Sequence, residues 1–294
     1  MNNLFSEKLI YFEIRDSGNS TADIIGNGNN VMVIEDFASI TEISCDGLPS
    51  LNSAVIRIYG LANDIMNKLS FIKYKGRNEV SNYTINCYYR NNNSLIFSGD
   101  IINSYPDYSK VPDVSFYISA ITNYRQIVNP TKPTSIKGEQ NITNIVNTIA
   151  KDMNVNYTVI NNGVNISDAN IYLEGSNIQK LIKLSQDYDF DIIINNNSIV
   201  ITDYDNVINN KNDVVILDCA KGDNVIGYIQ LTQDGVQLEI YFEPRIQLGC
   251  QIRIVNSYNT IANGDYKVTR LQHILYSKIE GSFKTLIKAN YYHV

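Results

Sequence analysis

Tryptophan is absent from the 294-residue sequence, and histidine is nearly absent, with two residues. A Ser–His–acid catalytic site would have to use His273, because His293 lies beside the C-terminus. His273 stands in an apolar run with Leu271, Ile274 and Leu275, and no catalytic motif surrounds it. We therefore expect His273 to be a satisfied, partly buried structural residue rather than a general base.

Cysteine is also scarce, and the four cysteines lie far apart without C-x-x-C spacing, which argues against a zinc or redox motif. Free cysteine behaves as a small hydrophobic residue, and three of the four lie in strand-like runs. We therefore expect buried free thiols rather than disulfides. The four residues are Cys45, Cys87, Cys219 and Cys250.

We expect neither a signal peptide nor a membrane span. Met1–Asn3 contains no basic residue, and the apolar run Leu9–Ile14 is short and contains Glu13. No run reaches the roughly 18 apolar residues that a membrane helix needs. The sequence therefore predicts synthesis in a reducing cytosol and no membrane insertion.

Charge is low, at 18% of residues against a usual value of about 25%. The net charge is −6, and no run of five like charges occurs. A protein that grips nucleic acid needs clustered Lys and Arg to release counterions, and such clusters are missing. A mildly acidic surface suits a conduit through which DNA slides without specific binding, and it suits ordinary solubility equally well.

A calcium loop is briefly suggested by the alternation of Asp187, Asp189 and Asp191. The EF-hand pattern needs glycine at its sixth position and glutamate at its twelfth, where this sequence has Ile192 and Ser198. We therefore interpret the three carboxylates as solvated groups at a helix-to-strand junction, and we predict no metal site.

Two further patterns of active sites are incomplete. Gly26-Asn27-Gly28 precedes no dinucleotide-binding helix, and no phosphate-loop GK[ST] occurs. Glu139 and Glu174 are the best candidates for a glycosidase pair. Each precedes a predicted helix, where the helix dipole favours an acid for structural reasons. We predict no catalytic residue and no cofactor, and we expect the protein not to be an enzyme.

The N-terminal region is organised around Ser53–Ser70. Its run Val55–Tyr59 is β-branched and aromatic and predicts a strand, which Gly60 ends. Asn63 is expected to be the N-cap of a helix of one to two turns that covers one end of a sheet. With about seven predicted strands, residues 1–130 are expected to form a barrel or a strongly bent sheet.

A hairpin is predicted where Tyr83–Arg90 and Leu95–Ile101 flank Asn91, Asn92 and Asn93. Asparagine tolerates positive φ and bonds to its own backbone, so this loop needs no glycine.

The middle region, 131–213, follows a linker bracketed by Pro130 and Pro133 and changes to helical periodicity. One apolar helix face is predicted from six residues at helical spacing, Ile142, Ile145, Val146, Ile149, Ala150 and Met153. A second helix is expected to open at Ser176, with Gln179 completing a capping box. A hairpin of Phe190–Ile194 and Ser198–Thr202 follows. The order predicts a compact α+β module.

The C-terminal region, 214–294, returns to β structure. Its predicted strands are Val214–Cys219, Gly227–Thr232, Gly235–Phe242, Cys250–Val255, Gly264–Leu271 and Ser282–Asn290. The fold class is therefore α+β, mainly β: two β regions, 1–130 and 214–294, with the small α+β module 131–213 inserted between them.

Three stretches resemble one family. IRIYGLANDIMNKLS, at Ile56–Ser70, resembles the strand and "yGLs–mnqL" signature of baseplate hub proteins from contractile-tailed bacteriophages, the tail hub or late control D-like family. Tyr172–Asp203 looks like the middle-domain pattern of those hubs. In the C-terminal part the order of short motifs agrees too: Gly227-Tyr228, Glu243-Pro244, Leu248-Gly249, Gly264-Asp265-Tyr266 and His273. Phe283 departs from the pattern, since relatives often have tryptophan there.

The resemblance implies a structural protein of the virion, located in the tail baseplate and assembled in the host bacterial cytoplasm. It implies that residues 1–130 and 214–294 are two barrel-like tube domains, and we predict that the Asn91–Asn93 tip contacts a neighbouring subunit or the tail tube. It also implies a homotrimer whose six similar domains form a pseudo-sixfold ring. Such a ring joins the tail tube protein to the central spike protein, contacts other baseplate proteins, and lets DNA pass through its lumen without specific binding.

Three alternatives stay open at this point. The same fold could serve as the hub of a phage-derived contractile injection or secretion device. A baseplate-borne cell-wall hydrolase would use Glu139 and Glu174. A carbohydrate-binding tail protein would carry exposed aromatic platforms.

Overall fold

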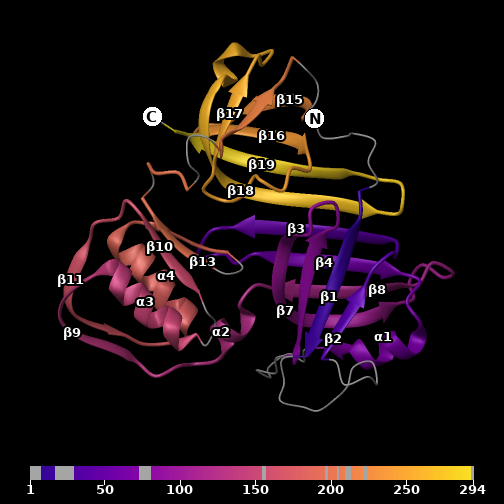
Figure 1. Cartoon of the computed structure of the whole chain (residues 1–294), viewed down its shortest axis with the longest axis horizontal. Coiled ribbons are helices and arrows are strands. Elements are labelled where there is room, and N and C mark those ends of the chain that lie inside the picture. The colour runs from indigo at the N-terminus through magenta and orange to yellow at the C-terminus, as the bar shows by residue number, and fades with distance from the viewer. Residues whose placement is uncertain are drawn as a thin grey trace. The chain divides into compact units, whose positions relative to one another are not determined.

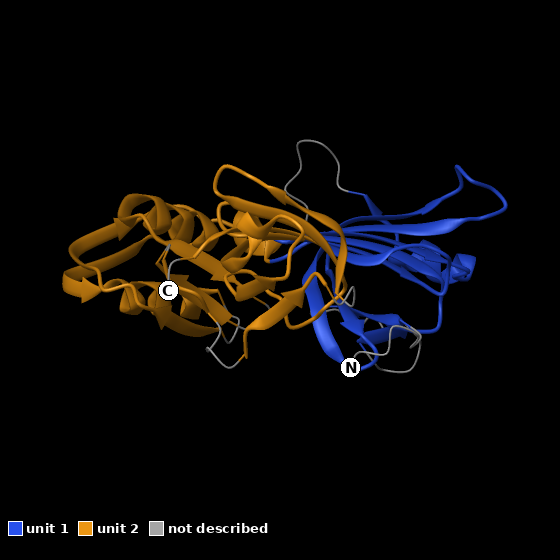
Figure 2. Cartoon of the chain, turned by 90° about the horizontal axis from the view of Figure 1, so that it is seen from above, with its two compact units in different colours: residues 1–44, 52–122, 272–285 blue, residues 45–51, 123–271, 286–294 orange. Residues whose placement is uncertain are grey.

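The computed structural model describes residues 8–16, 30–72, 81–153, 157–195, 198–203, 205–208, 213–220 and 224–292. The chain is mainly β, with 52% strand and 16% helix. Unit 1 comprises residues 1–44, 52–122 and 272–285, and unit 2 comprises residues 45–51, 123–271 and 286–294 (Figure 2). The division into three domains at residues 130 and 213 stays a prediction. Within the described ranges, each helix is too short or too polar to cross a membrane.

Unit 1 is built on a mainly antiparallel sheet (Figure 1). Within this unit the strand order is β3-β4-β8-β7-β6-β1-β2, and β5 pairs with β7. The strands are β1 (Ile10–Asp16), β2 (Val31–Ile34), β3 (Ser39–Asp46), β4 (Ser53–Tyr59), β5 (Phe71–Ile72), β6 (Tyr83–Tyr89), β7 (Ser94–Asp107) and β8 (Ser115–Ile121). In β4, Ala54, Ile56 and Ile58 are buried and alternate with half-buried neighbours, so one sheet face forms the core.

The predicted helix after β4 is α1 (Asn63–Leu69), and it buries Met66 and Leu69. The prediction of its N-cap was wrong by one residue. The cap position is Ala62, whose carbonyl accepts the Met66 N–H at 3.0 Å, and whose side chain cannot bond to the first turn. Asn63 is already helical, because Leu61 is buried and sets the point at which the chain turns into the helix.

The predicted strand Val114–Tyr124 is shorter in the structure. β8 ends at Ile121, and Asn123 adopts a left-handed conformation with φ of 57°. Asparagine tolerates this region of φ/ψ space better than most residues, so it can end a strand abruptly. The short helix α2 (Tyr124–Val128), which the sequence analysis did not predict, begins directly afterwards.

The middle of the chain forms the predicted helix–strand–helix–hairpin order, with two additional strands. Its elements are β9 (Thr134–Asn141), α3 (Ile142–Asp152), β10 (Thr158–Asn162), β11 (Ser167–Leu173), α4 (Asn177–Tyr188), β12 (Asp191–Ile194) and β13 (Ser198–Thr202). β10-β13-β12 form a small mixed sheet, and the unpredicted strands β9 and β11 form an antiparallel pair. The predicted face of α3 is buried, and it packs with α4 residues Ile178, Leu181 and Leu184 in one apolar cluster.

Side-chain caps fix where both long helices begin. Asn141 accepts the Thr143 N–H at 2.9 Å at the start of α3. At the start of α4, Ser176 accepts the Gln179 N–H at 3.3 Å, and the Gln179 side chain accepts the Ser176 N–H at 2.8 Å. The predicted capping box is therefore confirmed, and it satisfies two N–H groups that the helix itself leaves without a partner.

The predicted linker after α2 is held in place by a buried lysine. Lys180 in α4 donates to Thr131 Oγ1 at 2.9 Å and to the Lys132 carbonyl at 2.6 Å. Its side chain is fully buried, and this desolvation lowers the pKa of Lys180. The segment between α2 and β9 is thus attached to α4 by hydrogen bonds.

The C-terminal strands form a curved sheet in the order β15-β16-β19-β18, which continues as β18-β17-β14. The elements are β14 (Val215–Asp218), β15 (Val225–Leu231), β16 (Gly235–Tyr241), β17 (Gln251–Val255), the 3-10 helix η2 (Thr260–Ala262), β18 (Gly264–Ser277) and β19 (Phe283–Tyr291). All six predicted strands are present. β18 is longer than predicted, because its alternating burial continues through His273 and Leu275.

Candidate interaction surfaces

The predicted Asn91–Asn93 loop is an exposed hairpin tip between β6 and β7. The loop is shifted by one residue from the predicted position, because Tyr89 pairs with Ser94 and Arg90 belongs to the turn. Asn93 has φ of 52°, as a loop without glycine requires. Asn91 donates to Tyr89 Oη at 2.8 Å, and Asn92 accepts the Ser94 N–H at 3.1 Å. The tip is thus ordered by its own side chains, and its role as a contact stays a prediction.

A second exposed tip joins β7 and β8 in unit 1. Tyr108 and Val111 are 54% and 69% exposed there. Below the tip, Tyr105 stacks on Tyr117 with ring centroids 5.0 Å apart, and the Arg57 guanidinium lies 5.5 Å from the Tyr117 ring centroid. These contacts support the hairpin, whereas Tyr108 and Val111 remain open to solvent.

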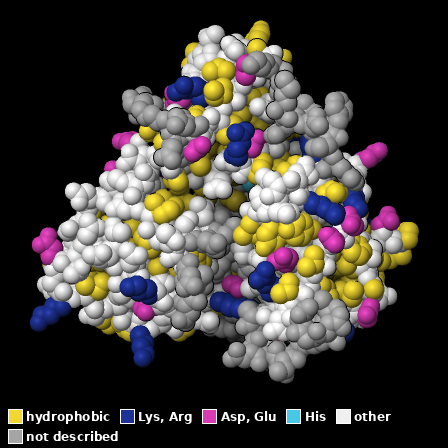
Figure 3. All heavy atoms as spheres, viewed as in Figure 1, with side chains coloured by type: hydrophobic (Ala, Val, Ile, Leu, Met, Phe, Trp, Pro, Cys, Tyr) yellow, Lys and Arg dark blue, Asp and Glu magenta, His cyan; other side chains and the backbone are white. Residues whose placement is uncertain are grey.

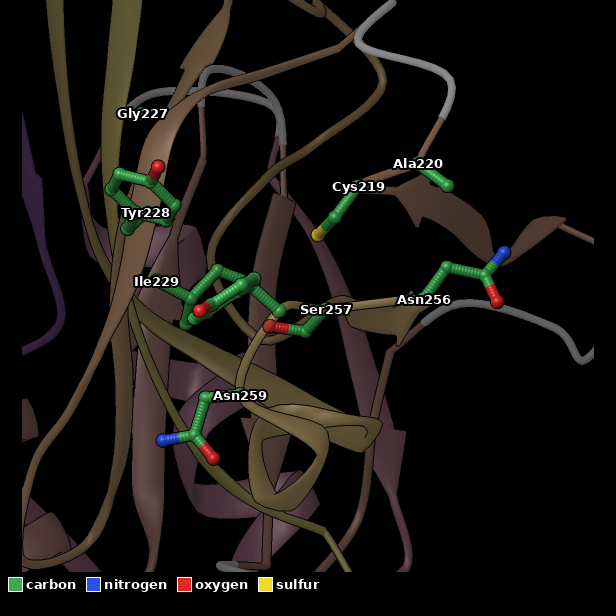
Figure 4. A pocket seen from close by; sticks show the side chains of 9 residues that line it. Cys219, Ala220, Gly227, Tyr228, Ile229, Asn256, Ser257 and Asn259 are labelled. Carbon is green, nitrogen blue, oxygen red and sulfur yellow. The ribbon is translucent and has the colours of Figure 1, made fainter.

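An apolar groove of about 580 Å³ lies at the C-terminal strands (Figure 4). It is lined by Cys219, Ala220, Gly227, Tyr228, Ile229, Asn256, Ser257, Tyr258 and Asn259. Tyr228 and Tyr258 are 79% and 92% exposed, and their rings meet edge to face with centroids 6.0 Å apart. Tyrosines this exposed add little to the core, so the groove is the candidate binding surface of this region.

Backbone geometry presents Tyr228 to this groove. The β15–β16 register shifts between Ile226 and Gln230, so the three residues 227–229 stand opposite Leu238 alone. Gly227 has φ of 72°, which glycine adopts without strain. Such a bulge bends a strand and re-aims its side chains.

The other wall of the groove is held by hydrogen bonds between neighbouring segments. The Cys219 N–H donates to the Val255 carbonyl at 3.0 Å, which extends the β14–β17 pairing. Asn256 donates to Asp218 Oδ1 at 2.9 Å, and Asn259 accepts the Ile261 N–H at 3.3 Å as the cap of η2. The wall therefore has a fixed shape, and burial raises the pKa of the Cys219 thiol, which favours its neutral form.

The structure places the candidate hydrolase pair on an open surface. Glu139 lies in β9 opposite Ala169, and Glu174 follows β11; both are exposed. Glu174 accepts a hydrogen bond from the Tyr172 hydroxyl at 2.7 Å. Both carboxylates are open to solvent and lack the apolar surroundings of a typical general acid.

His273 is buried, as expected, and even more completely than predicted. Its Nδ1 lies 2.8 Å from Thr285 Oγ1 across the β18–β19 pair. Burial lowers the pKa of His273 to about 4. A histidine enclosed between two strands has no access to a substrate, so its role is structural.

The DYDFD aspartates lie at the junction of α4 and β12, as predicted. Asp187 and Asp189 are exposed, and Asp191 lies 3.4 Å from Lys267 Nζ. No cluster of three or more potential ligands suitable for a metal ion occurs among the described residues. Gly26-Asn27-Gly28 lies outside the described residues.

The prediction of buried cysteines was right for Cys45 and Cys87 and wrong for the other two. All four are free thiols. Cys219 and Cys250 are half-buried because they lie just outside β14 and β17, where the chain leaves the sheet. The strand-like sequence extends one residue beyond each observed strand, to Cys219 after β14 and to Cys250 before β17.

Charged side chains form no basic surface on the face shown in Figure 3, where Lys and Arg lie scattered among acidic and apolar groups. Where described cations lie close to a surface, acids often accompany them. Asp36 contacts both Arg90 and Lys278 at 2.8 Å, and Arg253 bonds to Asp265 at 2.8 Å. This pattern agrees with the absence of basic clusters in the sequence.

The groove is not predicted from the sequence, although the Gly227-Tyr228 motif lines it. A glycine inside a strand-like run signals a bulge, and that signal was available. The position of Tyr258 opposite Tyr228 depends on tertiary structure, which one sequence does not reveal.

The fold is that of phage tail proteins. A tail protein of Neisseria meningitidis MC58 superimposes with a TM-score of 0.66 at 10% identity, covering 97% of both chains. The 43 kDa tail protein of prophage MuSo2 from Shewanella oneidensis gives 0.62 at 11% identity, also covering 97% of both. An Escherichia coli type VI secretion component, described as similar to T4 tail proteins gp27 and gp5, gives 0.58 at 9% identity, covering 87% of this chain and 74% of that one. No curated protein matches the sequence.

Residues 25–286 match the family described as Baseplate hub gp41. The chain belongs to this family, and it is thus a structural protein of the phage tail baseplate hub. The resemblance inferred from Ile56–Ser70 and Tyr172–Asp203 is confirmed.

Proposed function

We propose that this hub protein forms a homotrimer whose chains each contribute two barrel-like domains to a pseudo-sixfold ring. The ring joins the tail tube to the central spike and leaves a lumen for DNA. The observation that carries the proposal is the family match over residues 25–286 together with the tail-protein fold of nearly the whole chain. The finished virion carries the protein in its baseplate, after assembly in the host cytoplasm.

Chain organisation supports two tube-type domains. Antiparallel β segments occur before and after an inserted helical module. The first contains β7 and the second contains β18, and each of these two strands has 14 residues. Three chains with two such domains supply six β domains. A threefold assembly can then contact a sixfold tube on one side and a threefold spike on the other.

Charge supports passage of DNA without binding. The net charge is −6 and the isoelectric point is about 5.0. A phosphate backbone gains affinity from clustered cations, and like charges reduce contact. A conduit lined by such a protein would let DNA slide.

The exposed Asn91–Asn93 tip is proposed as a contact with a neighbouring subunit or the tube. Shortening the three asparagines to Asn-Gly should leave the melting temperature nearly unchanged, because the tip is exposed and buries no apolar surface. Assembly into particles should fall. An Asn92→Ala variant, which keeps the loop length, serves as control. Intact particles from the shortened variant would refute this contact.

The same fold in an injection or secretion device is the second candidate, because the structure resembles a type VI secretion component with a TM-score of 0.58. Neighbouring genes distinguish the two settings. Genes for capsid and packaging proteins beside this gene indicate a phage. Genes for a contractile sheath without capsid and packaging genes indicate an injection or secretion device.

Oligomeric state tests the main proposal. Native mass spectrometry should give a trimer, and an end-on electron-microscopy view should show six lobes of density. A strict monomer at high concentration and within virions would contradict the ring.

A further inference from the structure

The groove at Tyr228 and Tyr258 lies against β15, an edge strand that has no second partner strand among the described residues. β15 ends the sheet path and pairs only with β16, and β14 pairs only with β17. The groove is lined by residues 227–229 of β15 and by Cys219 and Ala220 at the end of β14 (Figure 4). The bulge of β15 and the segments that follow β14 and β17 therefore border the groove.

Hydrogen bonding shows which backbone groups of β15 point outward. The Thr232 N–H donates to the Gly235 carbonyl at 2.9 Å, and the Tyr241 N–H donates to the Asn224 carbonyl at 3.0 Å. Because bonding alternates along an antiparallel pair, the N–H and C=O groups of Val225 and Leu231 face away from β16. β15 therefore keeps unpaired backbone groups on its open edge on both sides of the bulge at residues 227–229, and these groups can pair with a further strand.

The chemistry of the lining defines what can enter. None of the nine lining residues carries a charge, and the polar groups are the Asn256 and Asn259 amides, the Ser257 and tyrosine hydroxyls and the Cys219 thiol. A charged ligand would lose its hydration without gaining an ionic partner. The exposed tyrosines offer large apolar rings with few rotatable bonds, which suit a side-chain anchor.

We propose that this groove binds an extended, uncharged segment of another protein of the tail assembly, which pairs with the β15 edge and packs a large apolar side chain against the exposed faces of the Tyr228 and Tyr258 rings. This inference rests on the proposed hub function for the identity of the partner. Strand addition of this kind takes affinity from main-chain hydrogen bonds and specificity from alternate side chains. A glycan would use the rings and amides but not the strand edge, so the free edge favours a polypeptide.

The test uses the full chain and a display library of linear eight-residue peptides. The library is selected on the wild type and depleted on a Tyr228→Ala/Tyr258→Ala double variant, which should fold because both side chains are mostly exposed. Enriched peptides are synthesised, and binding is measured by fluorescence anisotropy. Hydrogen exchange with mass spectrometry then reports which amides the peptide protects.

We expect enriched peptides to be uncharged with apolar residues at alternate positions. Affinity should fall at least tenfold in the double variant and in Ala220→Glu, which places a carboxylate in the neutral groove. Tyr172→Ala removes a tyrosine that is 55% exposed in β11 and should leave affinity unchanged. Exchange should slow in residues 225–231 when the peptide is bound.

Several results would overturn the proposal. These are a selection without enrichment over the double variant, binders unaffected by Ala220→Glu, and binding without protection of β15. A neutral glycan that binds the wild type on a glycan array and loses binding in the double variant would also overturn it. Native mass spectrometry in parallel separates the two ideas: a trimer without peptide binding refutes the groove alone, and a monomer that binds peptide refutes the ring alone.

Discussion

The α+β module around α3 and α4 and the C-terminal strands β14–β19 differ in where they place large apolar side chains. In the middle region, the described large hydrophobic residues exposed to solvent are Ile160 and Tyr172. In the C-terminal strands and their loops they are Ile216, Tyr228, Leu231, Tyr241, Tyr258, Ile261 and Tyr291. The first region uses its apolar residues for its own core, whereas the second leaves many exposed. Contiguous exposed apolar surface in a soluble chain marks an interaction site.

A large effect is expected in the core of the α+β module. Ile149 in α3 is fully buried in the cluster that joins α3 and α4. Ile149→Ala should lower the free energy of unfolding by about 2–5 kcal/mol, because it removes buried methylene groups and leaves a cavity. Urea denaturation followed by circular dichroism measures the change. Thr148→Ala, one residue away on the exposed face, should change stability by less than about 0.5 kcal/mol.

The C-terminal strands also contain buried structure, and pH should reveal it. Burial lowers the pKa of His273 to about 4, whereas an unfolded histidine titrates near 6.5. Between pH 6.5 and pH 4 the unfolded chain therefore binds the proton first, so stability should fall as pH falls through this window and no further below it. The loss from this group is about 3 kcal/mol.

The control for this prediction is His273→Gln, which keeps a polar group near Thr285 Oγ1 but does not titrate. Stability of both proteins is measured by denaturation between pH 7 and pH 4, and carboxylates contribute equally to each. The difference in stability between the wild type and the variant should shrink or reverse as pH falls. If both proteins lose the same stability over this range, His273 is not held neutral by the fold.

Helix capping gives an intermediate effect in the α+β module. Ser176→Ala removes the hydroxyl that accepts the Gln179 N–H, and it should cost about 1 kcal/mol. The same measurement on Ser176→Asp, which retains an acceptor, should give a stability near that of the wild type. An equal loss in both variants would assign the effect to packing rather than to the cap.

These regions also differ in how much of them the sequence predicted. The helices α3 and α4 were predicted because their apolar residues repeat at helical spacing and polar caps precede them. Strands β9 and β11 were missed because their sequences, TSIKGEQN and SDANIYL, are mostly polar and only Thr134, Ile171 and Leu173 are buried. A two-stranded pair that buries so little shows no alternation for a pattern to detect.

Single residues account for the other differences between the predictions and the structure. Asn63 has the chemistry of a cap, but the buried Leu61 fixes the turn one residue earlier. The groove depends on residues 219, 228 and 258, which only the folded sheet brings together. Local pattern therefore predicted the elements with a large buried face, and tertiary structure determined the candidate binding surface.

The smallest effect on the unfolding free energy is expected for the exposed tyrosines. It tests directly whether their rings belong to the core of the C-terminal strands. Tyr228→Ala should change the unfolding free energy of the isolated chain by less than about 0.5 kcal/mol, because 79% of the residue is already in water. Tyr266→Ala, at a fully buried tyrosine of the same strands whose hydroxyl bonds to the Ala262 carbonyl at 3.0 Å, should cost about 3–5 kcal/mol. If Tyr228→Ala proved as costly as Tyr266→Ala, the exposed ring would belong to the core, and no partner would be needed to explain it. If Tyr228→Ala leaves the unfolding free energy unchanged, the ring does not stabilise the isolated chain, and we expect its role in the assembly.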